Sequence, residues 1–233
     1  KVYEENFGDL PDGDITKVDE KSIPDHDILC AGFPCQAFSI SGKQRGFEDS
    51  RGTLFFDVAR IVKEKKPSIV FMENVKNFAT HDYGHTLEVV KSTMEELGYI
   101  FYQKVLNSVD YGIPQKRERI YMVCFRKNLN VNDFVFPNKG GQGERIYSTK
   151  GIAVTLSAYG GGVFAKTGGY LINGKTRKLH PRECARIMGY PDSYKISRSH
   201  SQAYKQFGNS VVIDVLQYVD IEIGKALEKK KKK

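Results

Sequence analysis

The sequence is poor in cysteine and contains no long apolar run. Its 233 residues include four cysteines and no Cys-x-x-Cys pair, which excludes a disulfide scaffold and argues against a zinc site. No apolar stretch approaches the ~20 residues that cross a membrane, and the first residues do not resemble a signal peptide. With 40% apolar and 27% charged side chains, we expect a soluble globular protein of a reducing cytoplasm.

Positive charge is unevenly placed along the chain. Five of the eight net charges belong to the lysine run 229–233, which is most simply a solvated end. Residues 1–30 carry a net charge of −6, whereas residues 139–182 carry +7. A basic block of this kind predicts contact with a phosphate backbone, although a solvated face explains the charge equally well.

Apolar runs and stretches of helical periodicity alternate in the first part of the chain. This alternation predicts a doubly wound α/β sheet, in which ligands bind at the carboxyl ends of the strands. The expected strands are residues 28–33, 68–72 and 119–125, and the expected helices are residues 53–66 and 84–97.

The composition then changes. Residues 140–174 hold ten of the 22 glycines and show no helical period, which predicts a segment rich in β-structure and loops. Helical periodicity returns at His180, with Pro181 suited to a first turn, and a last helix is expected at residues 210–227.

This pattern predicts two domains. We expect a catalytic α/β domain at residues 1–138, completed by about residues 203–233. Residues 139–202 are expected to form a smaller domain and its hinge.

Three groups of polar residues stand near the ends of expected strands. Cys35 follows one strand in a loop, where an ionised thiol can attack an electron-poor carbon, but a buried cysteine is the simpler explanation for this residue alone. Glu73 follows the next expected strand, where it could donate a proton to a bound group or cap a helix. Arg117 and Arg119 share one side of a strand by alternation, although a solvated strand end accounts for them as well.

Together, the motifs around these residues resemble the DNA cytosine-5 methyltransferase family. They occur in the family's order and span nearly the whole chain. The matching stretches are Gly32-Phe33-Pro34-Cys35-Gln36, Glu73-Asn74-Val75, Gln115-Lys116-Arg117-Glu118-Arg119, Arg177-Lys178-Leu179-His180-Pro181-Arg182-Glu183 and Gln206-Phe207-Gly208-Asn209-Ser210-Val211.

The resemblance implies an activity and a fold. The enzyme would transfer a methyl group from S-adenosylmethionine to C5 of a cytosine flipped out of double-stranded DNA, through a covalent bond from Cys35 to C6. Glu73, held protonated, would act at N3, Arg119 would hold O2, and Arg117 would orient its neighbours and a phosphate. The implied fold is a Rossmann-like methyltransferase sheet with a smaller β- and loop-rich target-recognition domain.

The resemblance also implies binding residues. No metal is needed, and His180 is expected to cap a helix rather than to act in catalysis. In the DNA complex, Ser41 and Gln142 would fill the space that the flipped base leaves, while Arg145 and Tyr159 would face the major groove. The implied contacts of the methyl donor are Asp14, Ile15, Pro34, Leu54, Asn209 and Ser210.

The resemblance is closest to a bacterial restriction–modification enzyme, which implies GCGC as the target with its inner cytosine modified. The implied partners are double-stranded DNA and a cognate restriction endonuclease that forms no stable complex. We expect a monomer acting on nucleoid DNA in the bacterial cytoplasm.

Two departures from the family pattern qualify this expectation. The chain opens at what resembles the third motif, Gly13-Asp14-Ile15, without the glycine-rich donor loop, and residues 136–139 join Gly140 directly where that enzyme has further residues. If these residues were the whole polypeptide, we would expect no donor binding unless a partner chain supplied the front segment. A truncated or split DNA-binding module is therefore the alternative, whereas a cysteine hydrolase does not account for Glu73 and the arginine pair.

Overall fold

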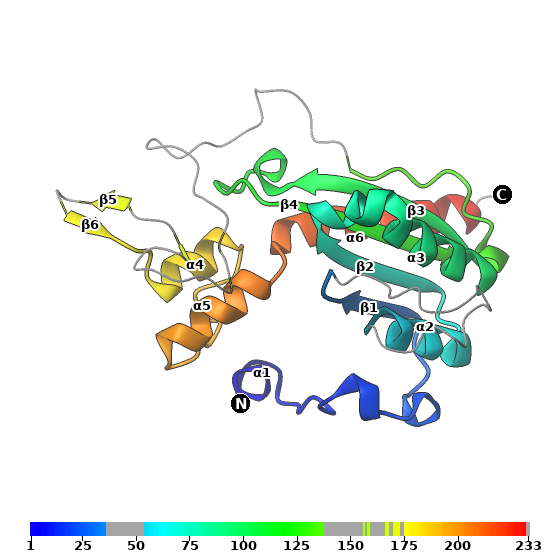
Figure 1. Cartoon of the computed structure of the whole chain (residues 1–233), viewed down its shortest axis with the longest axis horizontal. Coiled ribbons are helices and arrows are strands. Elements are labelled where there is room, and N and C mark those ends of the chain that lie inside the picture. Colours follow the sequence, from blue (N-terminus) through cyan, green and yellow to red (C-terminus); the bar gives the residue numbers. More distant parts are fainter. Residues whose placement is uncertain are drawn as a thin grey trace. The chain divides into compact units, whose positions relative to one another are not determined.

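The computed structural model describes the chain in several stretches (Figure 1). The described residues are 1–35, 54–137, 156, 158, 166–167, 170–172 and 175–231. The chain divides into two compact units, here named the sheet unit and the helical unit. The sheet unit comprises Asp12–Leu106, Glu118–Phe136 and Glu222–Lys233, and the helical unit comprises Lys1–Pro11, Asn107–Arg117 and Pro137–Ile221.

A mixed four-stranded sheet lies at the centre of the sheet unit. Its strands are β1 (Ile28–Gly32), β2 (Ile69–Val75), β3 (Tyr99–Asn107) and β4 (Glu118–Arg126), in the order β1-β2-β4-β3. β1 and β2 run parallel, as a helical crossover between strands requires, whereas β2 and β4 are antiparallel. The register places Glu73 between Gly32 of β1 and Tyr121 of β4.

The three expected strands are confirmed within three residues at each end. β3 was not predicted, because buried positions are few along it and Gln103 and Lys104 interrupt its apolar pattern. Its place beside β4 gives the sheet an additional strand that the sequence pattern does not reveal.

Two amphipathic helices contribute their apolar faces to the core of the sheet unit. Both helices were predicted, and they run as α2 (Leu54–Lys65) and α3 (His85–Glu96). Lys66 adopts a left-handed conformation directly after α2, and Pro67 prevents the helix from continuing. The core cluster of the two helices and β2 includes Phe55, Val58, Val62, Leu87, Val90, Met94, Val70 and Met72.

The helical unit contains short helices and a small hairpin. The elements wholly within it are α1 (Val2–Phe7), β5 (Tyr170–Ile172), β6 (Lys175–Arg177), α4 (Pro181–Ile187) and α5 (His200–Asn209). His180 caps α4 in a capping box with Glu183, and Pro181 opens the helix, which confirms the predicted start. α5 was not predicted.

The longest helix is α6 (Ile213–Lys231), which confirms the last helix expected from the sequence. Its first turn lies against Gly189, whose φ of 83° is left-handed and where a Cβ would lie 2.9 Å from Asp214 Oδ1. Only glycine satisfies both conditions without strain. No helix in the described stretches is long and apolar enough to span a membrane.

Candidate active site

The end of β1 carries the predicted nucleophile. Phe33 is buried, and its ring packs at 5.6 Å from the rings of both Phe55 and Phe78. Cys35 follows two residues later and is partly exposed. This aromatic cluster anchors the backbone just before Cys35, and therefore restricts where the thiol can lie.

A buried amide ties the end of β2 to this same turn. Asn74 is 3% exposed, and its Nδ2 donates to the carbonyl of Phe33 at 2.8 Å. Its Oδ1 accepts from the backbone N–H of Val75 at 2.8 Å. Because β1 and β2 are parallel, their carboxyl ends share one edge of the sheet, and Asn74 holds the strand end that bears Glu73 beside the turn that bears Cys35.

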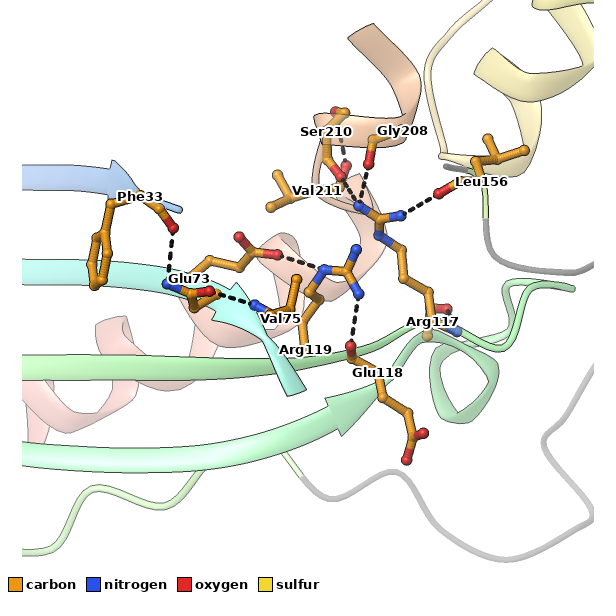
Figure 2. A network of polar contacts seen from close by, with 12 residues as sticks. Phe33, Glu73, Val75, Arg117, Glu118, Arg119, Leu156, Gly208, Ser210 and Val211 are labelled. Carbon is orange, nitrogen blue, oxygen red and sulfur yellow. Dashed lines mark hydrogen bonds and ion pairs between the residues drawn. The ribbon is translucent and has the colours of Figure 1, made fainter. Parts of the chain in front are cut away.

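Glu73 and Arg119 form an ion pair across neighbouring strands. Glu73 Oε1 lies 3.0 Å from Arg119 Nε, and Figure 2 shows the carboxylate and the guanidinium pointing toward each other. The two side chains are only 17% and 14% exposed. Arg119 also donates to the carbonyl of Glu118 at 2.8 Å, so two bonds orient its guanidinium beside the carboxylate.

The surroundings of Cys35 in this structure favour the thiol. Burial raises the pKa of Cys35 above its ordinary value, because a desolvated thiolate is less stable than a thiol.

Arg117 is a buried side chain that bonds to the backbone around it. It was expected to orient its neighbours and a phosphate, and its side chain is 3% exposed. Its guanidinium donates to three backbone carbonyls, those of Leu156 at 3.2 Å, Gly208 at 3.0 Å and Ser210 at 2.6 Å (Figure 2). All of these partners belong to the helical unit, so Arg117 fixes the turn that follows α5.

The predicted donor contacts fall into two groups. Asp14, Ile15, Pro34 and Leu54 belong to the sheet unit, and Asn209 and Ser210 belong to the helical unit. Asp14 caps the 3₁₀ turn Ile15–Lys17 by accepting from the backbone and hydroxyl of Thr16, and these bonds lower the pKa of the Asp14 carboxyl. The Ser210 hydroxyl shares a 2.5 Å hydrogen bond with the Tyr190 hydroxyl.

The predicted DNA contacts Ser41, Gln142, Arg145 and Tyr159 lie outside the described residues. Among the residues that are described, no group of three or more His, Cys, Asp or Glu side chains could hold a metal ion.

Sequence reasoning assigned no role to Asn74 or Tyr190. Asn74 stands within the quoted Glu73-Asn74-Val75 motif, which was a usable signal. Tyr190 gives no comparable signal, since its bond to Ser210 depends on how distant segments fold together.

Comparison with known proteins identifies relatives over nearly the whole chain. The family model described as C-5 cytosine-specific DNA methylase matches residues 1–154 and 141–225. The Type II methyltransferase M.HhaI of Haemophilus parahaemolyticus is 65% identical, covering 97% of this chain and 84% of that protein. M.SsoII of Shigella sonnei is 42% identical, covering 98% and 72%. The predicted resemblance to the DNA cytosine-5 methyltransferase family is thereby confirmed.

The matched stretch of M.HhaI is 276 residues long and exceeds this entire 233-residue chain. The relative therefore carries residues within the match that have no counterpart here.

Solved structures show the same fold at low sequence identity. The Dnmt2 methyltransferase of S. pombe matches with a TM-score of 0.68 and 18% identity, covering 95% of this chain and 86% of that one. The methyltransferase EhMeth of Entamoeba histolytica matches with a TM-score of 0.68 and 16% identity, covering 100% and 87%. These matches confirm the expected Rossmann-like methyltransferase fold.

Proposed function

The chain belongs to the C-5 cytosine-specific DNA methylase family and is a DNA cytosine-5-methyltransferase, and on this premise we propose the chemical roles of its residues. It transfers a methyl group from S-adenosylmethionine to C5 of a cytosine flipped out of double-stranded DNA. The reaction proceeds through a covalent bond between Cys35 Sγ and C6 of the base.

The observation that supports these roles best is the arrangement at the carboxyl ends of β1 and β2. An acid–guanidinium pair at 3.0 Å lies on β2 and β4, and the Asn74 amide ties β2 to the turn before Cys35. Nucleophile, acid and cation thus occupy neighbouring strands of one sheet, as a site that binds and protonates a flat polar ring requires.

The Cys35 thiol loses its proton to solvent, and the thiolate forms a bond to C6 while Glu73 gives a proton to N3 and the electrons of the C5–C6 double bond move toward C5. The methyl group bonds to C5 as its bond to the donor sulfur breaks, which would leave a neutral thioether. A base then removes the C5 proton, N3 returns its proton to Glu73, and the re-forming C5–C6 double bond expels the Cys35 thiolate. The donor supplies an electrophilic methyl group on a positively charged sulfur.

Glu73 and Arg119 act on opposite sides of the charge that develops on the base. In the structure Glu73 faces Arg119 at 3.0 Å. We propose that, with cytosine bound, Arg119 holds O2 and a protonated Glu73 faces N3. Glu73 can then donate to N3 as Cys35 adds.

The described residues of the sheet unit fit part of the methyl donor. Asp14 offers an exposed carboxylate that can accept hydrogen bonds from amino or hydroxyl groups. Ile15 and Leu54 are partly exposed apolar side chains, and Pro34 is exposed. Apolar side chains and a carboxylate acceptor are the groups that a planar, polar-edged ring such as adenine needs.

In the helical unit, Arg117 is a positioning residue. Its bonds to the carbonyls of Gly208 and Ser210 flank Asn209 and fix the backbone that presents both proposed donor contacts.

The finer biological assignments are also proposals. We propose GCGC as the target, with Gln142 and Ser41 filling the vacated space and Arg145 and Tyr159 reading the major groove. The similarity to Type II methyltransferases supports a restriction–modification role in the bacterial cytoplasm. We propose a monomer and no stable complex with the endonuclease.

Trapping the covalent bond tests this function. In a duplex with 5-fluorocytosine at the target, the fluorine on C5 cannot leave as a proton does, so the adduct to Cys35 persists. We expect a complex that survives denaturing electrophoresis, that requires the donor, and that is absent from Cys35→Ala. Cys30→Ala in β1 is the matched control and should retain trapping. DNA binding by the unaltered chain without any adduct would instead favour the DNA-binding module.

A further inference from the structure

The segment that carries Asp14 and Ile15 contains no buried side chain. Across residues 14–22, here named the donor-wall segment, every side chain is exposed or only partly buried. Two short 3₁₀ turns, Ile15–Lys17 and Glu20–Ser22, make up most of it. Apolar packing cannot fix such a segment, and its conformation therefore depends on polar contacts.

Arg60 of α2 makes three of these contacts and ties the segment to the helix. Its Nη2 donates to the carbonyl of Ile15 at 2.5 Å, and its Nη1 donates to the carbonyl of Val18 at 2.8 Å and to Glu20 Oε2 at 2.6 Å. One guanidinium thus joins both 3₁₀ turns of the donor-wall segment to α2.

The guanidinium is itself held in orientation. Asp57, one turn earlier on α2, accepts from Arg60 Nε at 3.0 Å, and the Arg60 side chain is 21% exposed. A planar fork with several fixed N–H donors can satisfy these separate acceptors at once, which a lysine ammonium on a flexible stem cannot reproduce.

We propose that Arg60 is a positioning residue for the methyl-donor site. It fixes Asp14 and Ile15 against α2, the helix whose first residue, Leu54, is another proposed donor contact. This inference rests on the proposed function, since it takes Asp14, Ile15 and Leu54 as donor contacts. Arg60 touches none of the reacting atoms and acts only through the donor-wall segment.

If Arg60 has this role, replacing it should weaken binding of the methyl donor and leave the chemical step nearly unchanged. Arg60→Gln keeps a polar side chain but cannot span the acceptors, and should weaken S-adenosylhomocysteine binding about tenfold in a calorimetric titration. The KM for S-adenosylmethionine should rise in proportion, while kcat at saturating donor changes less than about twofold. Arg60→Lys should fall between Arg60→Gln and the unaltered chain.

Lys65 offers a matched control on the same helix. Its Nζ donates to the carbonyl of Lys21 at 3.1 Å and lies 3.6 Å from Asp25. Lys65 therefore also joins α2 to the chain that follows Asp14 and Ile15, but it does not bond to the proposed donor contacts themselves. Lys65→Met should leave donor binding within about twofold of the unaltered chain.

Hydrogen exchange on the full chain gives a readout that needs no ligand. Arg60→Gln should accelerate exchange in peptides covering residues 14–18, with peptides of β2 and β4 unchanged. If exchange in residues 14–18 does not change, Arg60 does not hold this segment. If exchange becomes faster but donor affinity does not change, Arg60 holds the segment without affecting the donor site. If the unaltered chain binds no S-adenosylhomocysteine while Arg60→Gln loosens residues 14–18, Arg60 holds the segment, but the donor assignment and the positioning role are wrong.

Discussion

Two arginines hold backbone turns in the two units, and they do so in different surroundings. Arg60 in the sheet unit lies partly in solvent and combines two backbone carbonyls with the carboxylates of Asp57 and Glu20. Arg117 in the helical unit is buried and donates to three carbonyls. In both cases the turn carries residues proposed to contact the methyl donor. Because Arg60 is partly exposed, we expect its loss to loosen one segment. Because Arg117 is buried, we expect its loss to destabilise the helical unit.

The largest expected effect is that of Arg117→Met. Removing the guanidinium leaves buried carbonyls without these donors, each at a cost of ~1–3 kcal/mol, so we expect a loss of about 3 kcal/mol or more in the free energy of unfolding. Arg60→Gln should cost about 1 kcal/mol, because water can replace its partners. Urea unfolding measures both, and equal losses would refute the distinction by burial.

The more exposed pair Arg177–Glu183 extends the comparison of arginine contacts, because its contribution to stability should depend on pH. The hydrogen bond from Arg177, together with the backbone bond from His180, lowers the pKa of Glu183 from an ordinary 4.5 to about 2. A carboxyl with a depressed folded pKa stabilises the fold fully above pH 4.5 and loses that contribution as the pH falls toward 2. Glu183→Gln should therefore lower Tm at pH 6 and much less at pH 3. A Tm difference that does not change with pH would show that the charge is not involved.

The smallest expected effect concerns two cysteines of the sheet unit. Burial raises the pKa of Cys35, so its alkylation by iodoacetamide should be slow at pH 7 and still rising above pH 9. Cys30, which is exposed on β1, serves as the internal comparison in peptide mass spectrometry. Fast alkylation of Cys35 that levels off near pH 7 would mean that the thiol is already activated without substrate.

The sequence predicted most elements that an apolar run or helical spacing marks. β1, β2, α2 and α3 were found in this way, whereas β3 lacks such marks. α5 was missed although its buried residues Ala203, Tyr204 and Phe207 stand at helical spacing. The capping box at His180 was also predictable, because its residues lie close together in sequence.

For the site, sequence motifs pointed to the residue types and not to their partners. Cys35 could be placed just past a strand by counting along an apolar run, whereas Glu73, expected just past the next strand, lies within β2 because its pairing continues to Val75. The pairing of Glu73 with Arg119 depends on β4 running antiparallel beside β2. Arg60 and Arg117 bond to backbone carbonyls, which carry no sequence signature, so only the folded chain shows what they hold.

The buried Asn74 amide also limits which side chains residue 74 can carry. Its NH₂ group donates to the Phe33 carbonyl, so an aspartate in its place would set a carboxylate oxygen against a carbonyl oxygen where little solvent reaches. The turn that carries Cys35 would then lose its tie, and a charge would be buried without a partner. Asn74→Asp is therefore expected to lower both the activity and the melting temperature.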